Sequence, residues 1–230
     1  MNEPLRVLVA CETSGVARRA FAALGHDVWS CDIEPAEDRS NRHIVCDVRD
    51  GILNEGWDLL AVMHPPCTRL CRSGRRWMSG PGKWTPPKKL PKGRTLKSML
   101  EEFELGVDIF TTCWNAPIER VAIENPEMND LARDVMPDDL PAPHMVQPFW
   151  FGEPVYKSTG WYLRGLKPLT PTDMLAEPER GSDEWKTWNY IHRLPPSSER
   201  SRLRSRSFTG MMSAAAMQWA GEAFEEIGAA

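Results

Sequence analysis

Short apolar runs rich in β-branched residues alternate with amphipathic stretches through the first half of the chain. Each run is followed by an acidic residue or a proline turn, a pattern typical of buried parallel strands whose carboxyl ends face a crevice. Five strands are expected, at residues 5–11, 26–31, 44–46, 57–63 and 121–123. Apolar positions at helical spacing predict helices over residues 14–24, ended by Gly25, and over residues 96–114.

The second half of the chain has a different pattern. After Pro141 we expect antiparallel pieces, with a strand at residues 158–163. Residues 168–201, rich in Pro, Asp and Glu, are expected to form a surface loop with one short helix near 185–190, and a last helix is expected over 209–226. Together these elements predict an α/β fold: one domain over residues 1–230 with a mostly parallel sheet and helices on both faces.

Chemically active side chains follow the predicted strands in order. They are Glu12, Asp32, Asp47, Cys67 and Glu124. In a doubly wound sheet these positions line one crevice, the usual place of a cofactor, and a carboxylate after the second strand can accept hydrogen bonds from ribose hydroxyls. The alternative is that the acids only stabilise helix starts. A dehydrogenase is not indicated, because the first turn lacks Gly-x-Gly-x-x-Gly.

A local excess of positive charge follows the fourth strand. Ten of the 28 basic residues lie between Arg69 and Lys97 without an acidic residue among them, although the whole chain has a net charge of −4. Prolines make a regular helix or strand implausible there, so residues 68–95 are interpreted as a basic loop insertion. Trp77 and Trp84 lie among the cations, a mixture that suits phosphates and bases. The alternative is a solvated loop.

Cysteine usage and hydropathy indicate the compartment. The six cysteines lie in strand-like and helix-like segments rather than in a spaced framework, so we expect reduced thiols and no metal site. No leader-like segment and no apolar stretch of about 20 residues is found, which predicts a cytoplasmic protein without a membrane partner.

The order of these motifs resembles that of the S-adenosylmethionine-dependent DNA cytosine-5 methyltransferases, particularly small phage-type forms. The resemblance rests on Val-Leu-Val-Ala-Cys-Glu-Thr-Ser-Gly at residues 7–15, Asp32, Asp47, Pro65-Pro66-Cys67 and Glu124-Asn125-Pro126. It implies a class I methyltransferase (Rossmann-like) fold, S-adenosylmethionine as cofactor, and DNA or a cytosine nucleotide as partner, in the cytosol of a bacterium or a phage-infected host.

The resemblance also implies roles for individual residues. Cys67 matches the nucleophile, Glu124 matches the acid at N3 of cytosine, and Lys157 stands where the family has an arginine. The cofactor-binding positions that it implies are Ala10, Cys11, Glu12, Ser14, Gly15, Asp32, Ile33, Asp47, Val48 and Pro65. The nucleic-acid or substrate positions expected from the resemblance and the basic insertion are Arg69, Arg72, Arg75, Arg76, Lys83, Asn125 and Thr159.

The implied chemistry explains why a thiol and an acid are needed together. C5 of cytosine is a poor nucleophile until a thiolate adds to C6, and an acid at N3 stabilises the charge that builds on the ring. Each residue has a simpler interpretation as well. Cys67 could be a small buried apolar residue, and Glu124 could cap a helix after Pro126 or pair with Arg120.

Three departures from the family keep two alternatives open. The glycine-rich first turn is reduced to Gly15, Thr68 and Thr159 replace a glutamine and an arginine, and only residues 165–201 are available for a target-recognition region. One alternative is C5 methylation of free deoxycytidine monophosphate (dCMP). The other is a catalytically silent protein that binds DNA or the cofactor. The target sequence and the oligomeric state are not predicted.

Overall fold

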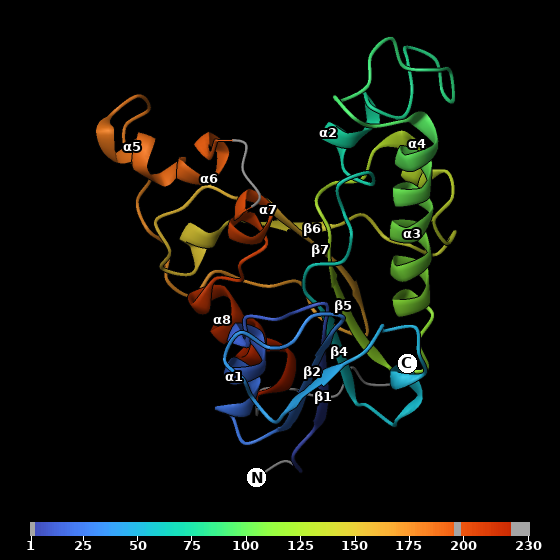
Figure 1. The fold of residues 1–230 in the computed structure, drawn as a ribbon. Coiled ribbons are helices and arrows are strands. Elements are labelled where there is room, and N and C mark those ends of the chain that lie inside the picture. Colours follow the sequence, from blue (N-terminus) through green and yellow to red (C-terminus); the bar gives the residue numbers. More distant parts are fainter. Residues whose placement is uncertain (1–2, 196–198, 222–230) are drawn as a thin grey trace.

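A seven-stranded sheet forms the centre of the molecule in the computed structural model, which describes residues 3–195 and 199–221 (Figure 1). Its strands are β1 (Arg6–Ala10), β2 (Asp27–Asp32), β3 (His43–Val45), β4 (Leu59–Val62), β5 (Arg120–Glu124), β6 (His144–Val146) and β7 (Thr159–Arg164). They lie in the order β3-β2-β1-β4-β5-β7-β6. The first five are parallel, and β7 runs antiparallel to both β5 and β6. The predicted α/β fold with a mostly parallel sheet is therefore confirmed.

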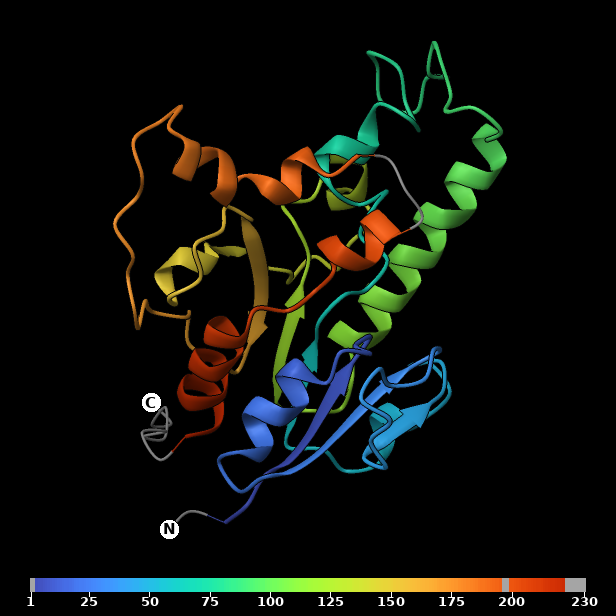
Figure 2. The ribbon, with the colours of Figure 1, turned by 60° about the vertical axis from the view of Figure 1, so that its left-hand side comes forward.

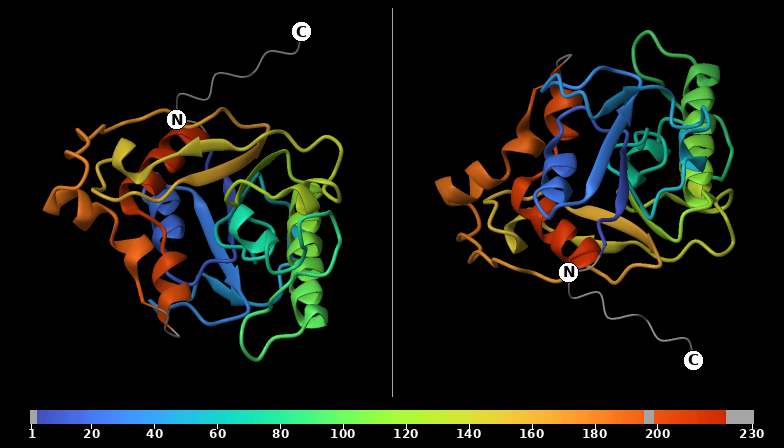
Figure 3. Two further views of the ribbon diagram at one scale, coloured as in Figure 1. Left: turned by 90° about the horizontal axis from the view of Figure 1, so that it is seen from above. Right: turned by 90° about the horizontal axis from the view of Figure 1, so that it is seen from below.

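Helices cover both faces of this sheet. The α-helices are α1 (Val16–Ala22), α2 (Arg72–Arg75), α3 (Leu96–Trp114), α4 (Asp130–Arg133), α5 (Asp183–Trp188), α6 (Tyr190–Arg193), α7 (Glu199–Arg204) and α8 (Thr209–Ala220). Two 3-10 helices, η1 (Ile52–Asn54) and η2 (Pro148–Trp150), lie between them. Helix α3 packs on one face, and α1 packs with α8 on the other (Figure 3). None of the helices described is long and apolar enough to cross a bilayer.

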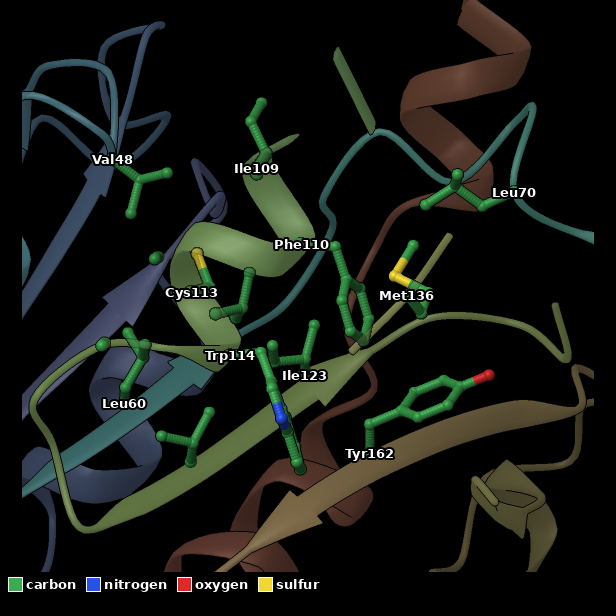
Figure 4. Close-up of a cluster of buried hydrophobic side chains, with 14 of the residues drawn as sticks. Val48, Leu60, Leu70, Ile109, Phe110, Cys113, Trp114, Ile123, Met136 and Tyr162 are labelled. Atoms are coloured by element: carbon green, nitrogen blue, oxygen red, sulfur yellow. The ribbon is translucent and has the colours of Figure 1, made fainter. Parts of the chain in front are cut away.

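Two apolar layers hold the helices against the sheet. The layer beneath α3 contains Phe110, Trp114, Ile123 and Tyr162, with the rings of Phe110 and Tyr162 packed edge to face 5.3 Å apart (Figure 4). Helix α3 begins where Thr95 and Ser98 form a reciprocal capping box, which satisfies two backbone donors that a helix start leaves unpaired. Packing and capping thus fix the long crossover helix that precedes β5.

Several short elements were not predicted. Helix α2 lies inside the proline-rich insertion, and β6, α4, α6 and α7 were also missed. Helix α2 depends on packing, because a Cβ at Gly74 would lie 2.1 Å from the Thr68 carbonyl oxygen. Helix α8 ends at Ala220 among the described residues, and the predicted continuation over 222–226 lies outside them.

Candidate active site

One cleft of about 930 Å³ opens at the carboxyl ends of the parallel strands. The strand order reverses between β1 and β4, and such a reversal is where open α/β sheets bind ligands. The cleft brings together two sets of predicted residues: Cys11, Ser14, Asp32 and Pro65 from the cofactor set, and Cys67, Glu124 and Lys157 from the catalytic set. Cys11, Ser14 and Asp32 come from the ends of β1 and β2, whereas Pro65 and Cys67 follow β4 on the other side of the reversal.

Cys67 lies in the turn after β4 and lines this cleft. Its carbonyl oxygen accepts hydrogen bonds from the backbone N–H groups of Leu70 and Cys71, both at 3.0 Å. Burial, with added repulsion from Glu124 and Cys71, raises the pKa of the Cys67 thiol to about 12, and Lys157 opposes this rise. The sulfur is therefore a protonated thiol at neutral pH.

The buried Asn129 holds the chain that follows Cys67. Its Nδ2 donates hydrogen bonds to the carbonyls of Arg69 at 2.8 Å and Cys71 at 3.0 Å, while its Oδ1 accepts from the backbone of Leu131 and Ala132. One side chain thus caps α4 and fixes the start of the basic insertion. Sequence analysis missed this residue, since asparagine near a proline turn has many ordinary uses.

Glu124 is the last residue of β5 and is 5% exposed. Burial raises the pKa of its carboxyl group to about 7, and Lys157 counteracts the rise. No hydrogen bond fixes this carboxyl group within the part of the chain that is described. The two simpler interpretations do not apply, because Asn129 caps α4 and Arg120 lies at the opposite end of β5.

Lys157 precedes β7 and places an amine in the same buried environment. Its Nζ lies 5.5 Å from the ring centre of Phe208, and its backbone N–H donates to Gln147 Oε1 at 3.2 Å. Burial lowers the pKa of Lys157, while Glu124 and Cys67 raise it. A thiol, a carboxyl group and an amine thus interact electrostatically in one site, which is a set suited to nucleophilic addition with proton transfer.

Asn125 and Thr159 are buried next to the cleft-lining residues Glu124 and Ser158. Asn125 donates its backbone N–H to the Gly160 carbonyl at 3.0 Å and its Nδ2 to the Pro126 carbonyl at 2.6 Å. Thr159 Oγ1 donates to the Lys157 carbonyl at 3.1 Å. Both side chains are buried and neither lines the cleft, so they fix the ends of β5 and β7 rather than face a ligand.

The turn from β1 to α1 has a special backbone. Cys11 and Gly15 have φ values of 54° and 70°, and a Cβ at Gly15 would lie 2.5 Å from Asp38 Oδ2. Buried Glu12 accepts hydrogen bonds from the Ser14 hydroxyl and, at 2.8 Å, from the Val16 backbone N–H. Glu12 therefore stabilises the start of α1, as the simpler interpretation expected, and its Oε2 is buried without a partner among the described residues.

The other predicted cofactor residues have diverse positions. Asp32 lines the cleft, and only its Oδ1 is engaged in the described structure, by the Glu34 backbone N–H at 3.0 Å. Ile33 beside it is 69% exposed. Asp47 and Val48 do not line the cleft: the Asp47 carboxylate pairs with Arg49 at 2.5 Å, and Val48 packs in the core beneath α3. Ala10 is fully buried in β1 and can offer only its backbone.

Cys11, Ser14 and Asp32 line the end of the cleft beside β1 and β2. The Asp32 carboxylate faces the cleft, Ser14 lies in the turn that opens α1, and exposed Ile33 does not line the cleft. Asp32 could hold the ribose hydroxyls of a nucleotide-containing cofactor, and the same cleft continues to Cys67.

Acidic residues neutralise much of the basic insertion. Five of its nine cations form ion pairs with carboxylates of α3, α4 and the segments beside α4. The pairs are Arg69–Glu102, Arg72–Glu127, Arg75–Asp130, Lys83–Asp134 and Arg94–Glu102. The predicted nucleic-acid residues Arg69, Arg75 and Lys83 therefore act in part as structural ties. Trp77 has the guanidinium of Arg76 4.7 Å from its ring centre, whereas Trp84 is half exposed.

A second basic wall of the cleft comes from the end of the chain, where sequence analysis expected only a surface loop and the last helix. Arg200, Arg204 and Arg206 line the cleft together with His64. His64 Nε2 lies 3.0 Å from Ser207 Oγ, which ties the end of β4 to the segment before α8. Figure 2 shows α2 and helices α5 to α7 on the same side of the molecule, beyond the strand ends. The alternating arginines of residues 200–206 were the available signal.

A scan against protein-family models finds no family that matches the chain, and a search of curated proteins finds no similar sequence.

Proposed function

We propose that this protein transfers a methyl group from S-adenosylmethionine to C5 of cytosine in DNA, and that its domain has the class I methyltransferase fold. The observation that carries the proposal is the single cleft that joins Cys67, Glu124 and Lys157 to an end suited to the ribose of a nucleotide-containing cofactor. The order β3-β2-β1-β4-β5 supports the fold, since nucleotide-binding doubly wound sheets share it and bind their ligand at the same reversal.

S-adenosylmethionine, when bound, supplies an electrophilic methyl group. Cys67 provides the nucleophile: its proton passes to water in the cleft, its sulfur bonds to C6 of cytosine, and the electrons of the C5–C6 double bond move into the ring. Protonated Glu124 donates its proton to N3 at the same time, so that no negative charge builds on the ring. A pKa of about 7 gives Glu124 a large protonated fraction at neutral pH.

After methylation, the same residues act in reverse. The proton on C5 leaves to water, the electrons re-form the C5–C6 double bond, and the Cys67 thiolate is expelled from C6. The proton on N3 returns to Glu124. Lys157 assists both steps because its charge lowers the pKa of Cys67 and so stabilises the thiolate that enters and leaves.

The test is transfer of tritium from S-[methyl-³H]adenosylmethionine to duplex DNA, single-stranded DNA or dCMP. Cys67→Ser is the informative variant, and Cys71→Ser is its matched control because Cys71 lines the same cleft four residues later. We expect label in DNA with the parent protein and with Cys71→Ser, and none with Cys67→Ser. Label in dCMP alone would replace DNA by a free nucleotide as substrate. If no substrate is labelled although calorimetry shows that S-adenosylmethionine binds, the proposed activity is overturned and a catalytically silent binding protein is the better account.

A trapped adduct gives an independent readout. Fluorine at C5 cannot leave as a cation, so an oligonucleotide with 5-fluorocytosine is expected to remain bonded to Cys67 after methyl transfer. Peptide mass analysis should find the added mass on the peptide that contains Cys67. An adduct on Cys71 instead would show that the nucleophile was assigned to the wrong cysteine.

A further inference from the structure

The basic insertion contains a second hollow, separate from the acid, thiol and amine. Its volume is about 460 Å³, and its walls include Arg76, Trp77, Lys88 and Lys89. Lys88 and Lys89 are exposed, and neither they nor Arg76 forms an ion pair in the portion of the chain that is described. The four cations of the insertion that lack such a pair are Arg76, Lys88, Lys89 and Lys92, and three of them meet here.

Arg72 connects this hollow to the cleft, because its side chain lines both. Its ion pair with Glu127 lies at the surface, where such a pair contributes little to stability and can be exchanged for a phosphate contact. Positive charge therefore continues from the cleft, past Arg72, to Lys88 and Lys89. Lys88 and Lys89 do not line the cleft, so a ligand that occupies only the cleft does not contact them.

We propose that the insertion hollow binds the phosphodiester backbone of a polynucleotide whose target base occupies the cleft. This inference rests on the proposed function and adds where the backbone of the substrate binds outside the cleft. A free nucleotide would meet all its partners inside the cleft and leave Lys88 and Lys89 without a role. Arg76 stacked on Trp77 forms a planar cation fixed in place, suited to bidentate contact with a phosphate group.

The experiment is fluorescence anisotropy of a labelled DNA oligonucleotide, duplex and single-stranded, over a range of salt concentrations. The variant is Lys88→Gln with Lys89→Gln. Its matched control is Lys92→Gln with Lys167→Gln, which removes the same charge from exposed lysines outside the hollow. We expect the variant to bind at least about tenfold more weakly and its slope of log K against log salt to decrease by about 2, as for two lost phosphate contacts. The control should resemble the parent protein.

Two results of the binding experiment would overturn the inference, and one result of the tritium assay would do so as well. One is unchanged affinity and salt slope in the Lys88/Lys89 variant, and the other is an equal loss in the control, which would reveal a general effect of charge. Binding is measured without methyl transfer, so its outcome is separate from that of the tritium assay. Methyl transfer to dCMP by a protein that does not bind DNA would overturn this inference but would agree with the proposed methyl-transfer chemistry.

Discussion

The burial of the Glu124 carboxyl group predicts a pH dependence of protein stability that can be measured without a substrate. Burial raises the pKa of Glu124 from an ordinary 4.5 to about 7 in the folded protein. The folded state therefore holds a proton that the unfolded state releases. The stabilising effect of this proton is fully present below pH 4.5 and is lost as the pH rises through 7. A rise from 4.5 to about 7 corresponds to about 3 kcal/mol of unfolding free energy.

Glu124→Gln keeps the shape of the side chain and removes its ionisation. We expect the unfolding free energy of the variant to exceed that of the parent protein by up to about 3 kcal/mol at pH 8.5. The difference should vanish near pH 4.5. This value is an upper bound, because the substitution also removes the carboxylate that stabilises the charge of Lys157. Release of the Lys157 proton limits this loss, since burial lowers the pKa of Lys157. Urea unfolding at both pH values measures the difference, with the exposed Glu119→Gln as control. Parallel pH profiles for parent and variant would refute the reasoning.

Two further predictions concern the cleft. Lys157→Gln removes the cation that lowers the pKa of Cys67, so alkylation of Cys67 by iodoacetamide at pH 8, followed by peptide mass analysis, should slow several-fold; an equal or faster rate would contradict this. Gly15→Ala places a Cβ at a φ of 70° and only 2.5 Å from Asp38 Oδ2. We expect it to lower the unfolding free energy by about 1–3 kcal/mol, measured by thermal unfolding, and to weaken S-adenosylmethionine binding, measured by calorimetry. Gly25→Ala is the control for strain alone, since its Cβ would meet open space; equal losses of cofactor affinity would disprove the steric part of the prediction.

The main elements could be predicted because their local pattern and their packing agree. The five parallel strands were placed to within two residues at each end, and α3 was predicted with its observed bounds of Leu96–Trp114. The apolar side of α3 supplies a sheet-facing surface, so periodicity alone identified it. Helices α2, α4 and α6 have four residues each, too few to show a period, and contacts such as those of Gly74 and Asn129 hold two of them in place.

The site was predictable as far as it depends on strand ends. Cys67 and Glu124 follow β4 and end β5, so the topology alone brings them to one edge of the sheet. Charge was harder to predict, because the acids that neutralise the basic insertion lie in other elements, at sequence separations of up to 55 residues, as for Arg72 with Glu127. The arginines before α8 were missed because no local pattern places that segment over the cleft.

The packing of α1 against α8 joins residues almost 200 positions apart, and His26 Nε2 donates to the Ala220 carbonyl at 2.8 Å beside this contact. The part of this sheet face that α8 covers therefore stays exposed on the ribosome until α8 has been synthesised. Such long-range contacts slow folding and prolong the exposure of apolar surface to aggregation. Because the arginine wall of the cleft directly precedes α8, a nascent chain also completes its cleft only after residues 200–206 have been synthesised.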